Sequence, residues 1–128
     1  MSADGTDKSG VDLSLMLGQA EVETALTLAS DLILVISSTG IIESVRVNPG
    51  LRIPQNQIND WVGRDVRDTL TVESVAKLDA RVFKTKAPII EAIELNHGDG
   101  QHRDYPIRYA CSRIADEKTI MLGRDLHT

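Results

Sequence analysis

Two apolar runs joined by a glycine-containing turn, within Asp31–Val47, constrain the fold of this chain most strongly. The run Leu32–Ile36 contains only Leu, Ile and Val, and residues 38–40 supply the small side chains and the glycine of a tight turn. The stretch Ile41–Val47 then resumes with apolar and polar side chains in alternation. This pattern predicts an antiparallel β-hairpin. Because the first run is apolar on both faces, we expect this hairpin in the middle of a sheet, with other structure packed on each side.

The sequence after the hairpin predicts helices followed by three more strands. Short irregular helical turns are expected over Leu51–Asp60, where Pro54 and several amide side chains interrupt any regular pattern. Thr71 is the candidate N-cap of an amphipathic helix that ends before Ala87-Pro88. The strands are expected over Ile89–Leu95, Tyr105–Ile114 and Thr119–Gly123. Five strands in an antiparallel meander, with helices on one side, predict an α+β domain.

The N-terminal part of the chain predicts a disordered lead-in and one helix. Residues 1–10 are small, polar and rich in turn formers, whereas residues 11–128 are expected to fold as a single domain. Asp12 is a plausible N-cap for an amphipathic helix over residues 12–30. The apolar side chains of this helix fall on two stripes, one with Leu13, Met16, Leu17, Ala20 and Leu28, the other with Leu15, Val22, Leu26 and Ala29.

The second stripe of this helix predicts an interaction surface. A helix that only lies on a sheet needs one apolar stripe, about 100° wide, so the other stripe requires a partner. Burial of both stripes within one monomer is the alternative interpretation. We expect the helix to bury apolar area against a second copy of the chain, through Leu13, Leu15, Met16, Leu17, Val22 and Leu26.

Composition excludes several classes of function. The net charge of −5 and the scattered arginines argue against direct nucleic-acid contact, which needs clustered Lys and Arg. The single cysteine, Cys111, cannot close an intrachain disulfide, which favours a cytoplasmic location. The polar N-terminus is unlike a signal peptide, and no apolar stretch approaches the roughly 20 residues of a membrane span. We therefore expect that this segment binds neither nucleic acid nor a membrane.

The predicted order of elements, with Trp61–Asp65 ahead of the amphipathic helix and Leu122–Leu126 at the end, resembles a PAS domain. The resemblance covers about Leu26 to Leu126, and the Gly-Arg-Asp run at Gly123–Asp125 matches the end of the last PAS strand. More specifically, the chain is similar to the N-terminal domain of the PpsR/CrtJ-type repressors of photosynthesis genes in purple bacteria. Those repressors carry PAS-type domains ahead of a C-terminal helix-turn-helix, which this chain lacks.

The resemblance implies a non-catalytic module that mediates interaction, oligomerisation and signal relay in a cytoplasmic transcriptional repressor. It implies a homo-oligomer, dimer or higher, and an antirepressor or sensor protein as a possible partner of the full-length protein. It implies no cofactor, because Arg52–Trp61 lacks the reactive cysteine of flavin-binding PAS domains, and Leu51–Ile93 lacks the histidine of haem-binding ones. The alternative is a sensor of an uncoloured small molecule, which would need a polar-lined cavity of about 300 Å³ or more.

Other candidate sites have simpler interpretations. His97, Asp99, His102 and Asp104 lie close together in sequence, but their spacing matches no zinc pattern and the adjacent glycines favour a solvated hairpin tip, so no metal site is expected. Cys111 falls on the inward side of its strand, where a thiol is usually inert. The sequence contains no nucleophile–His–acid set and no phosphate-binding loop, so we expect no catalytic residues and no enzyme activity.

Overall fold

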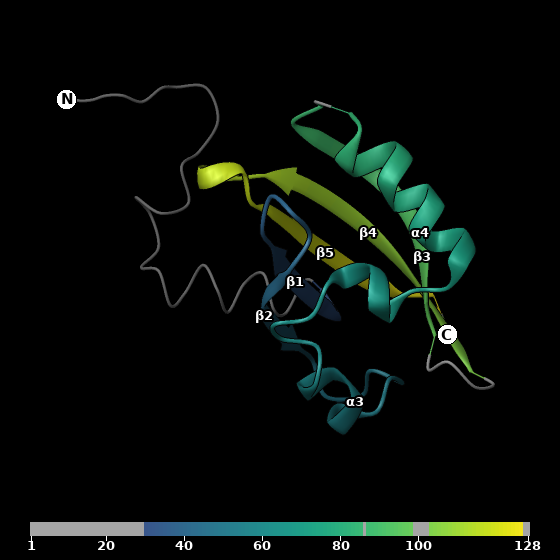
Figure 1. The fold of residues 1–128 in the computed structure, drawn as a ribbon. Helices are drawn as coiled ribbons and strands as arrows, with labels where there is room; N and C mark the ends of the chain where they lie inside the picture. The colour runs from purple at the N-terminus through teal and green to yellow at the C-terminus, as the bar shows by residue number, and fades with distance from the viewer. Residues whose placement is uncertain (1–29, 86, 99–102, 127–128) are drawn as a thin grey trace, which may run out of the picture.

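The computed structural model describes residues 30–85, 87–98 and 103–126. These residues form a five-stranded antiparallel sheet with strand order β2-β1-β5-β4-β3 (Figure 1). The strands are β1 (Leu32–Ile36), β2 (Ile42–Val47), β3 (Ile89–Gly98), β4 (Asp104–Arg113) and β5 (Thr119–Asp125). The predicted α+β class and the five-stranded sheet are confirmed. The predicted lead-in, and the helix over residues 12–30 except Ser30, lie outside the described residues.

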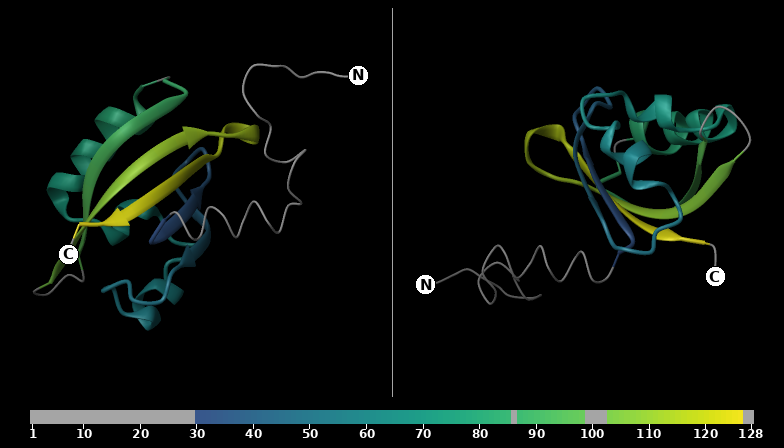
Figure 2. Two further views of the ribbon diagram at one scale, coloured as in Figure 1. Left: turned by 180° about the vertical axis from the view of Figure 1, so that it is seen from behind. Right: turned by 90° about the horizontal axis from the view of Figure 1, so that it is seen from below.

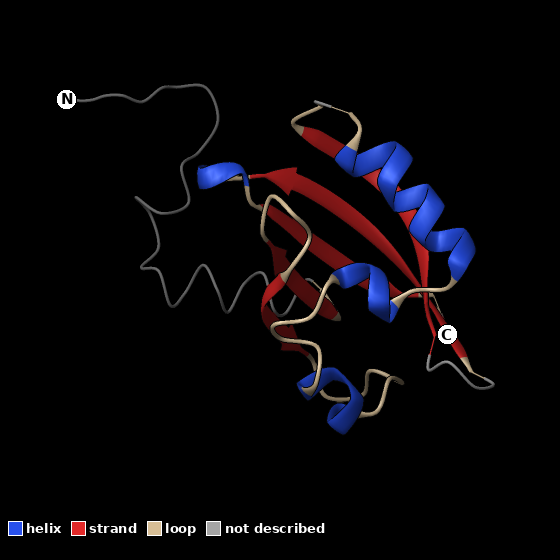
Figure 3. Ribbon diagram, viewed as in Figure 1, coloured by secondary structure: helices blue, strands red, loops and turns tan. Residues whose placement is uncertain are grey.

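Short helices connect β2 to β3 and lie over one face of the sheet (Figures 2 and 3). They are α3 (Gln55–Asn59), a 3₁₀ turn (Val66–Thr69), and α4 (Val72–Leu78), which continues into a π-helical turn (Asp79–Phe83). The predicted N-cap is confirmed, since the Thr71 hydroxyl accepts a hydrogen bond from the Ser74 N–H at 3.4 Å. A further 3₁₀ turn, Ala115–Glu117, connects β4 to β5.

The hairpin formed by β1 and β2 does not occupy the middle of the sheet. The central strand is β5, which pairs with β1 on one side and with β4 on the other, while β2 is an edge strand. The expectation failed because β1 and β5 are both apolar on two faces, and hairpin pairing does not reveal which strand joins next. The last strand of the chain therefore holds the two halves of the sheet together.

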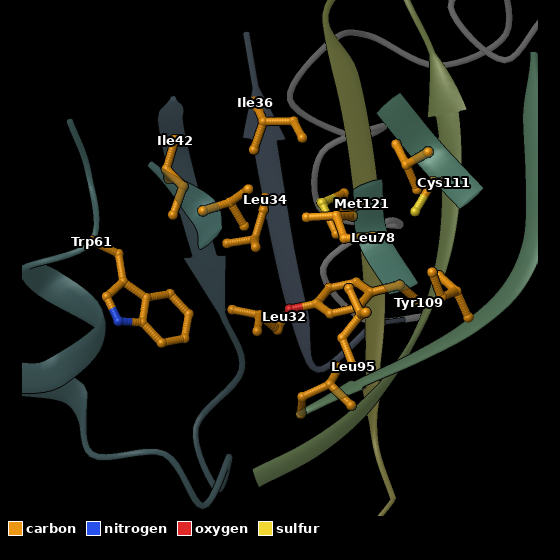
Figure 4. Close-up of a cluster of buried hydrophobic side chains, with 14 of the residues drawn as sticks. Leu32, Leu34, Ile36, Ile42, Trp61, Leu78, Leu95, Tyr109, Cys111 and Met121 are labelled. Carbon is orange, nitrogen blue, oxygen red and sulfur yellow. The ribbon is translucent and has the colours of Figure 1, made fainter. Parts of the chain in front are cut away.

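The core lies between the inner face of the sheet and the short helices. Alternate residues of the strands point into it, as the apolar periodicity predicts. Figure 4 shows Trp61, from the segment after α3, approaching the strand side chains from one side, and Leu78 of α4 lying among them. The inner-face residues Leu32, Leu34, Leu95, Tyr109 and Met121 are fully buried in this cluster.

Side chains of α4 and the π-helical turn bind the free backbone groups of the edge strand β3. The Ser74 hydroxyl accepts from the Asn96 N–H at 2.7 Å, the Lys77 ammonium donates to the Glu94 carbonyl at 2.8 Å, and the Arg81 guanidinium donates to the Ala92 carbonyl at 3.0 Å. The Thr71 N–H also donates to the Asn96 carbonyl at 3.0 Å. An exposed sheet edge invites pairing with other chains, and here the helix occupies it.

Candidate functional site

His97 lies in the centre of the domain rather than at a solvated hairpin tip. Strand β3 extends to Gly98, so His97 pairs with Tyr105 of β4 and its side chain is fully buried. Its ring stacks on Trp61, with centroids 4.6 Å apart and planes 23° from parallel. The prediction of a loop at His97 was wrong, because Gly98 continues the strand instead of ending it. Asp99 and His102 lie outside the described residues, and Asp104 begins β4.

Both ring nitrogens of His97 make hydrogen bonds. The ring Nε2 lies 2.6 Å from the Tyr109 hydroxyl, and Nδ1 lies 3.0 Å from the Thr69 hydroxyl. Because the Thr69 hydroxyl donates to the Val66 carbonyl at 2.7 Å, it accepts from Nδ1–H, and Tyr109 then donates to Nε2. The result is a directed chain of hydrogen bonds through the core that fixes one neutral tautomer of His97.

Burial shifts the titration of both rings toward their neutral forms. It lowers the pKa of His97 from 6.5 to about 4, opposed only in part by the hydrogen bond to the Thr69 carbonyl. It also raises the pKa of Tyr109 well above its usual value, with a smaller contribution from Cys111. Neither group is therefore charged near neutral pH. Among the described residues, no group of three or more His, Cys, Asp or Glu side chains could hold a metal ion.

In the described part of the chain, buried side chains cover the inner face of the sheet. Two of the pockets at the surface of this part have volumes of about 460 and 200 Å³, and neither is lined by Trp61, His97 or Tyr109. The larger one lies between the end of the π-helical turn and the turn after β4. Its Arg113 donates to the Val82 and Thr85 carbonyls, so this guanidinium caps the helical segment. The size of this pocket exceeds the value set for a sensor cavity, but its position is outside the core.

Cys111 lies on the inner side of β4, as its place in the strand predicts, and is 1% exposed. Burial raises the pKa of its thiol to about 12, although Arg113 and Arg81 act in the opposite direction. A thiol with this pKa holds almost no reactive thiolate near neutral pH.

A polar cluster at the surface joins the points where the chain enters β1 and leaves β5; we call it the junction. The Asp31 carboxylate accepts from the Asp125 N–H at 2.8 Å, and the Asp31 N–H donates to the Gly123 carbonyl at 2.8 Å. The Arg52 guanidinium holds the Asp125 carboxylate in a two-pronged ion pair, with N–O distances of 2.8 and 3.3 Å. The smaller pocket opens at this junction and is lined by Asp31, Arg52 and Asp125.

The ion pair at the junction is better shielded than an ordinary surface pair. The Asp125 side chain is 10% exposed and the Arg52 side chain 32%. Paired N–H donors facing two carboxylate oxygens fix the orientation as well as the distance of the two groups. Asn48, the residue directly after β2, also donates a hydrogen bond from its side-chain amide to the Ser30 carbonyl at 2.6 Å. Three segments far apart in sequence, residues 30–31, 48–52 and 123–125, are therefore held together where the chain enters and leaves the sheet.

Sequence reasoning identified half of this junction. The Gly-Arg-Asp run ends β5 as expected, and its Gly123 is required because a Cβ there would lie 2.7 Å from Ile107 Cγ2. The sequence analysis singled out neither Asp31 nor Arg52 as a site residue. The signal available was Asn48-Pro49-Gly50, a turn that returns the chain toward β1 and carries Arg52 with it. The six predicted interface residues of the leading helix lie outside the described residues.

Comparison with known proteins gives the fold and one sequence relative. No family model matches the chain. The structure is similar to the PAS domain of an HTR-like protein from Haloarcula marismortui, with a TM-score of 0.63 and 14% identity over 89% of this chain and 96% of that one. The sequence is 31% identical to Protein CrtJ of Rhodobacter capsulatus over 103 residues, which are 79% of this chain and 22% of the relative. The chain thus spans about a fifth of that relative's length. It has the fold of a PAS domain, and its sequence is similar to part of CrtJ.

Proposed function

We propose that this PAS domain is a non-catalytic interaction and signal-relay module of a transcriptional repressor. The similarity to CrtJ supports the regulatory role, and the junction carries the relay, because it joins the incoming and outgoing chain through Asp31, Arg52 and Asp125. A change in the segment before β1 then alters the hydrogen bonds between Asp31 and the end of β5, and so the position of the segment that follows β5. The DNA-binding part and any antirepressor or sensor partner belong to the longer protein in this proposal.

Replacement of Arg52 tests the relay. Arg52→Gln removes the two-pronged ion pair with the Asp125 carboxylate, so we expect the segments before β1 and after β5 to be held less tightly. We expect faster backbone hydrogen exchange in residues 12–29 and 126–128, with the core strands unchanged. The matched control is Arg64→Gln, which removes the exposed ion pair with Asp60. Equal exchange in the two variants would overturn the relay.

Oligomerisation is the second part of the proposal and rests on the leading helix predicted over residues 12–30. A few hundred Å² of apolar burial between two copies, at about 25 cal/mol per Å², stabilises a dimer by several kcal/mol before the loss of association entropy. Leu15→Glu or Leu26→Glu is expected to abolish assembly while the far-ultraviolet circular dichroism stays unchanged. Light scattering over a concentration series measures the mass. Variants that remain oligomeric, or that unfold, would assign the helix to the core of one monomer.

Within the described residues, no helix is long and apolar enough to cross a membrane. A cytoplasmic location remains part of the proposal. The small-molecule sensor remains the alternative, and the pockets of about 460 and 200 Å³ lie outside the core cluster.

A further inference from the structure

The larger surface pocket, of about 460 Å³, lies at the end of the sheet where β1 ends and β5 begins; we call it the turn pocket. It is lined by Ser38 of the β1–β2 turn, by Phe83 and Lys84 at the end of the π-helical turn, and by Glu117 of the β4–β5 turn (Figure 1). Small-molecule sites usually have volumes of about 300–1,000 Å³. The junction lies at the opposite end of the same two strands, so the turn pocket is separate from it.

Glu117 lines the turn pocket in a backbone conformation that glutamate rarely adopts. Its φ is 60°, and that of the preceding Asp116 is 63°. Glycine, asparagine and aspartate take this left-handed conformation more readily than residues with longer side chains. The Glu117 side chain is exposed, and its carboxylate makes no hydrogen bond or ion pair within the described residues. Unusual backbone conformations of this kind gather at functional sites, and here the conformation brings an unpaired carboxylate to a pocket.

Lys84 brings the opposite charge to the turn pocket. Its side chain is exposed, and within the part of the chain that the structure describes its ammonium pairs neither with Glu117 nor with another group. Arg113 also lines the pocket, but its guanidinium donates to the Val82 and Thr85 carbonyls and so holds the helical segment. The two unpaired charges therefore favour a ligand that carries one positive and one negative group.

The turn pocket also has apolar walls. Ile114 lines it and is 43% exposed, which is unusual for a large apolar side chain. Phe83 is partly buried against the core, and the Arg67 guanidinium lies over its ring, 4.3 Å from the centroid. Arg67 is itself held by Asp65 and Asp79, with N–O distances of 3.1 and 2.9 Å. The position of the Phe83 ring is thus fixed in advance, which lowers the entropy lost when a ligand packs on it.

We propose that the turn pocket binds a small zwitterion with an apolar side chain, of the class of apolar α-amino acids. Glu117 pairs with the ammonium group of the ligand, Lys84 pairs with its carboxylate, and Phe83 and Ile114 contact its apolar side chain. This proposal goes beyond the proposed function, because the site involves neither the junction nor the leading helix. The bound molecule would connect the β1–β2 turn, the end of the π-helical turn and the β4–β5 turn.

Titration of the full chain with L-phenylalanine, followed by NMR of the backbone amides, tests the site. We expect shifts at residues 38, 83–85 and 113–117, and none around residues 31, 49–52 and 125 of the smaller pocket. No shift up to the solubility limit of L-phenylalanine would overturn the proposal. Shifts centred on Trp61, His97 and Tyr109 would also overturn it, because the ligand would then enter the core.

Two derivatives of the probe test each charge separately. 3-Phenylpropionate lacks the ammonium group, and L-phenylalaninamide lacks the carboxylate. Each is expected to bind about two- to fivefold more weakly than L-phenylalanine, because one exposed ion pair is lost. Equal or tighter binding of either derivative would overturn the assignment of a zwitterion.

Substitutions connect these charges to their partners in the chain. Glu117→Gln should bind L-phenylalanine and 3-phenylpropionate equally well, and Lys84→Gln should bind L-phenylalanine and L-phenylalaninamide equally well. Glu91→Gln removes an exposed carboxylate of β3 and is the matched control, which should bind as the natural protein does. Discrimination that persists in Glu117→Gln or Lys84→Gln would overturn the role of that residue.

Glu117→Gly separates ligand binding from folding. Glycine adopts a φ of 60° without a steric penalty, so this variant should lose affinity for L-phenylalanine while it unfolds at the same or a higher urea concentration. A lower midpoint of unfolding would show that the Glu117 carboxylate supports the fold, and would overturn its assignment to a ligand.

Discussion

His97 makes the stability of this domain depend on pH. Its pKa is about 4 in the folded protein and about 6.5 in the unfolded chain, so below pH 6.5 the unfolded chain binds a proton that the native protein excludes. The free energy of unfolding should be independent of His97 above pH 6.5 and should fall as the pH decreases from 6.5 to 4. A shift of this size corresponds to about 3 kcal/mol in total.

Urea unfolding at pH 7, 5 and 4 measures this effect. His97→Gln should be less stable than the natural protein at pH 7, because it loses the hydrogen-bonded imidazole and its stack on Trp61, but its stability should vary less with pH. His102→Gln, in the stretch predicted as a solvated loop, is the control and should keep the full pH dependence. The same pH dependence in all three proteins would assign the acid sensitivity to carboxylates instead.

The helix α4 holds the edge of β3 through polar contacts, in addition to burying Leu78 in the core. Ser74→Ala should lower the free energy of unfolding by about 1–3 kcal/mol, because the Asn96 N–H loses its acceptor at a site where Ser74 is 1% exposed. Ser44→Ala, at an exposed position of β2, should change it by less than about 0.5 kcal/mol. Equal effects in chemical denaturation would show that water replaces the lost bond without cost.

The sequence predicts a strand or helix well where its apolar periodicity extends over many residues. It does not reveal which strands lie next to each other in the sheet. Alternation in β4 correctly places Tyr105, Ile107, Tyr109 and Cys111 on the inner face, and Thr71 correctly marks the start of α4. The central position of β5 depends on contacts between residues about 90 positions apart, which no local pattern encodes. The junction is missed for the same reason, because Arg52 reaches Asp125 across 73 residues.

At the level of the whole molecule, the closed core should make Cys111 a reporter of global unfolding. Its thiol is 1% exposed and its pKa is raised to about 12, so it should react with a thiol reagent only when the sheet opens. Under native conditions the labelling rate should equal the unfolding rate when labelling is faster than refolding. When labelling is slower than refolding, the rate should be proportional to the equilibrium population of the unfolded state. Rapid labelling of the folded protein, with unchanged circular dichroism, would reveal local opening near β4.

The junction also determines how the domain affects the chain in which it is embedded. Because the Asp31 nitrogen and the Gly123 carbonyl oxygen are 2.8 Å apart, the stretch of residues 31–123 begins and ends at almost one point. For the flanking sequence such a domain acts as a closed loop of nearly zero span, so inserting or removing it changes the distance between its neighbours very little. Mechanical tension along the chain would load the Arg52–Asp125 ion pair and the bonds around it before it reached the core.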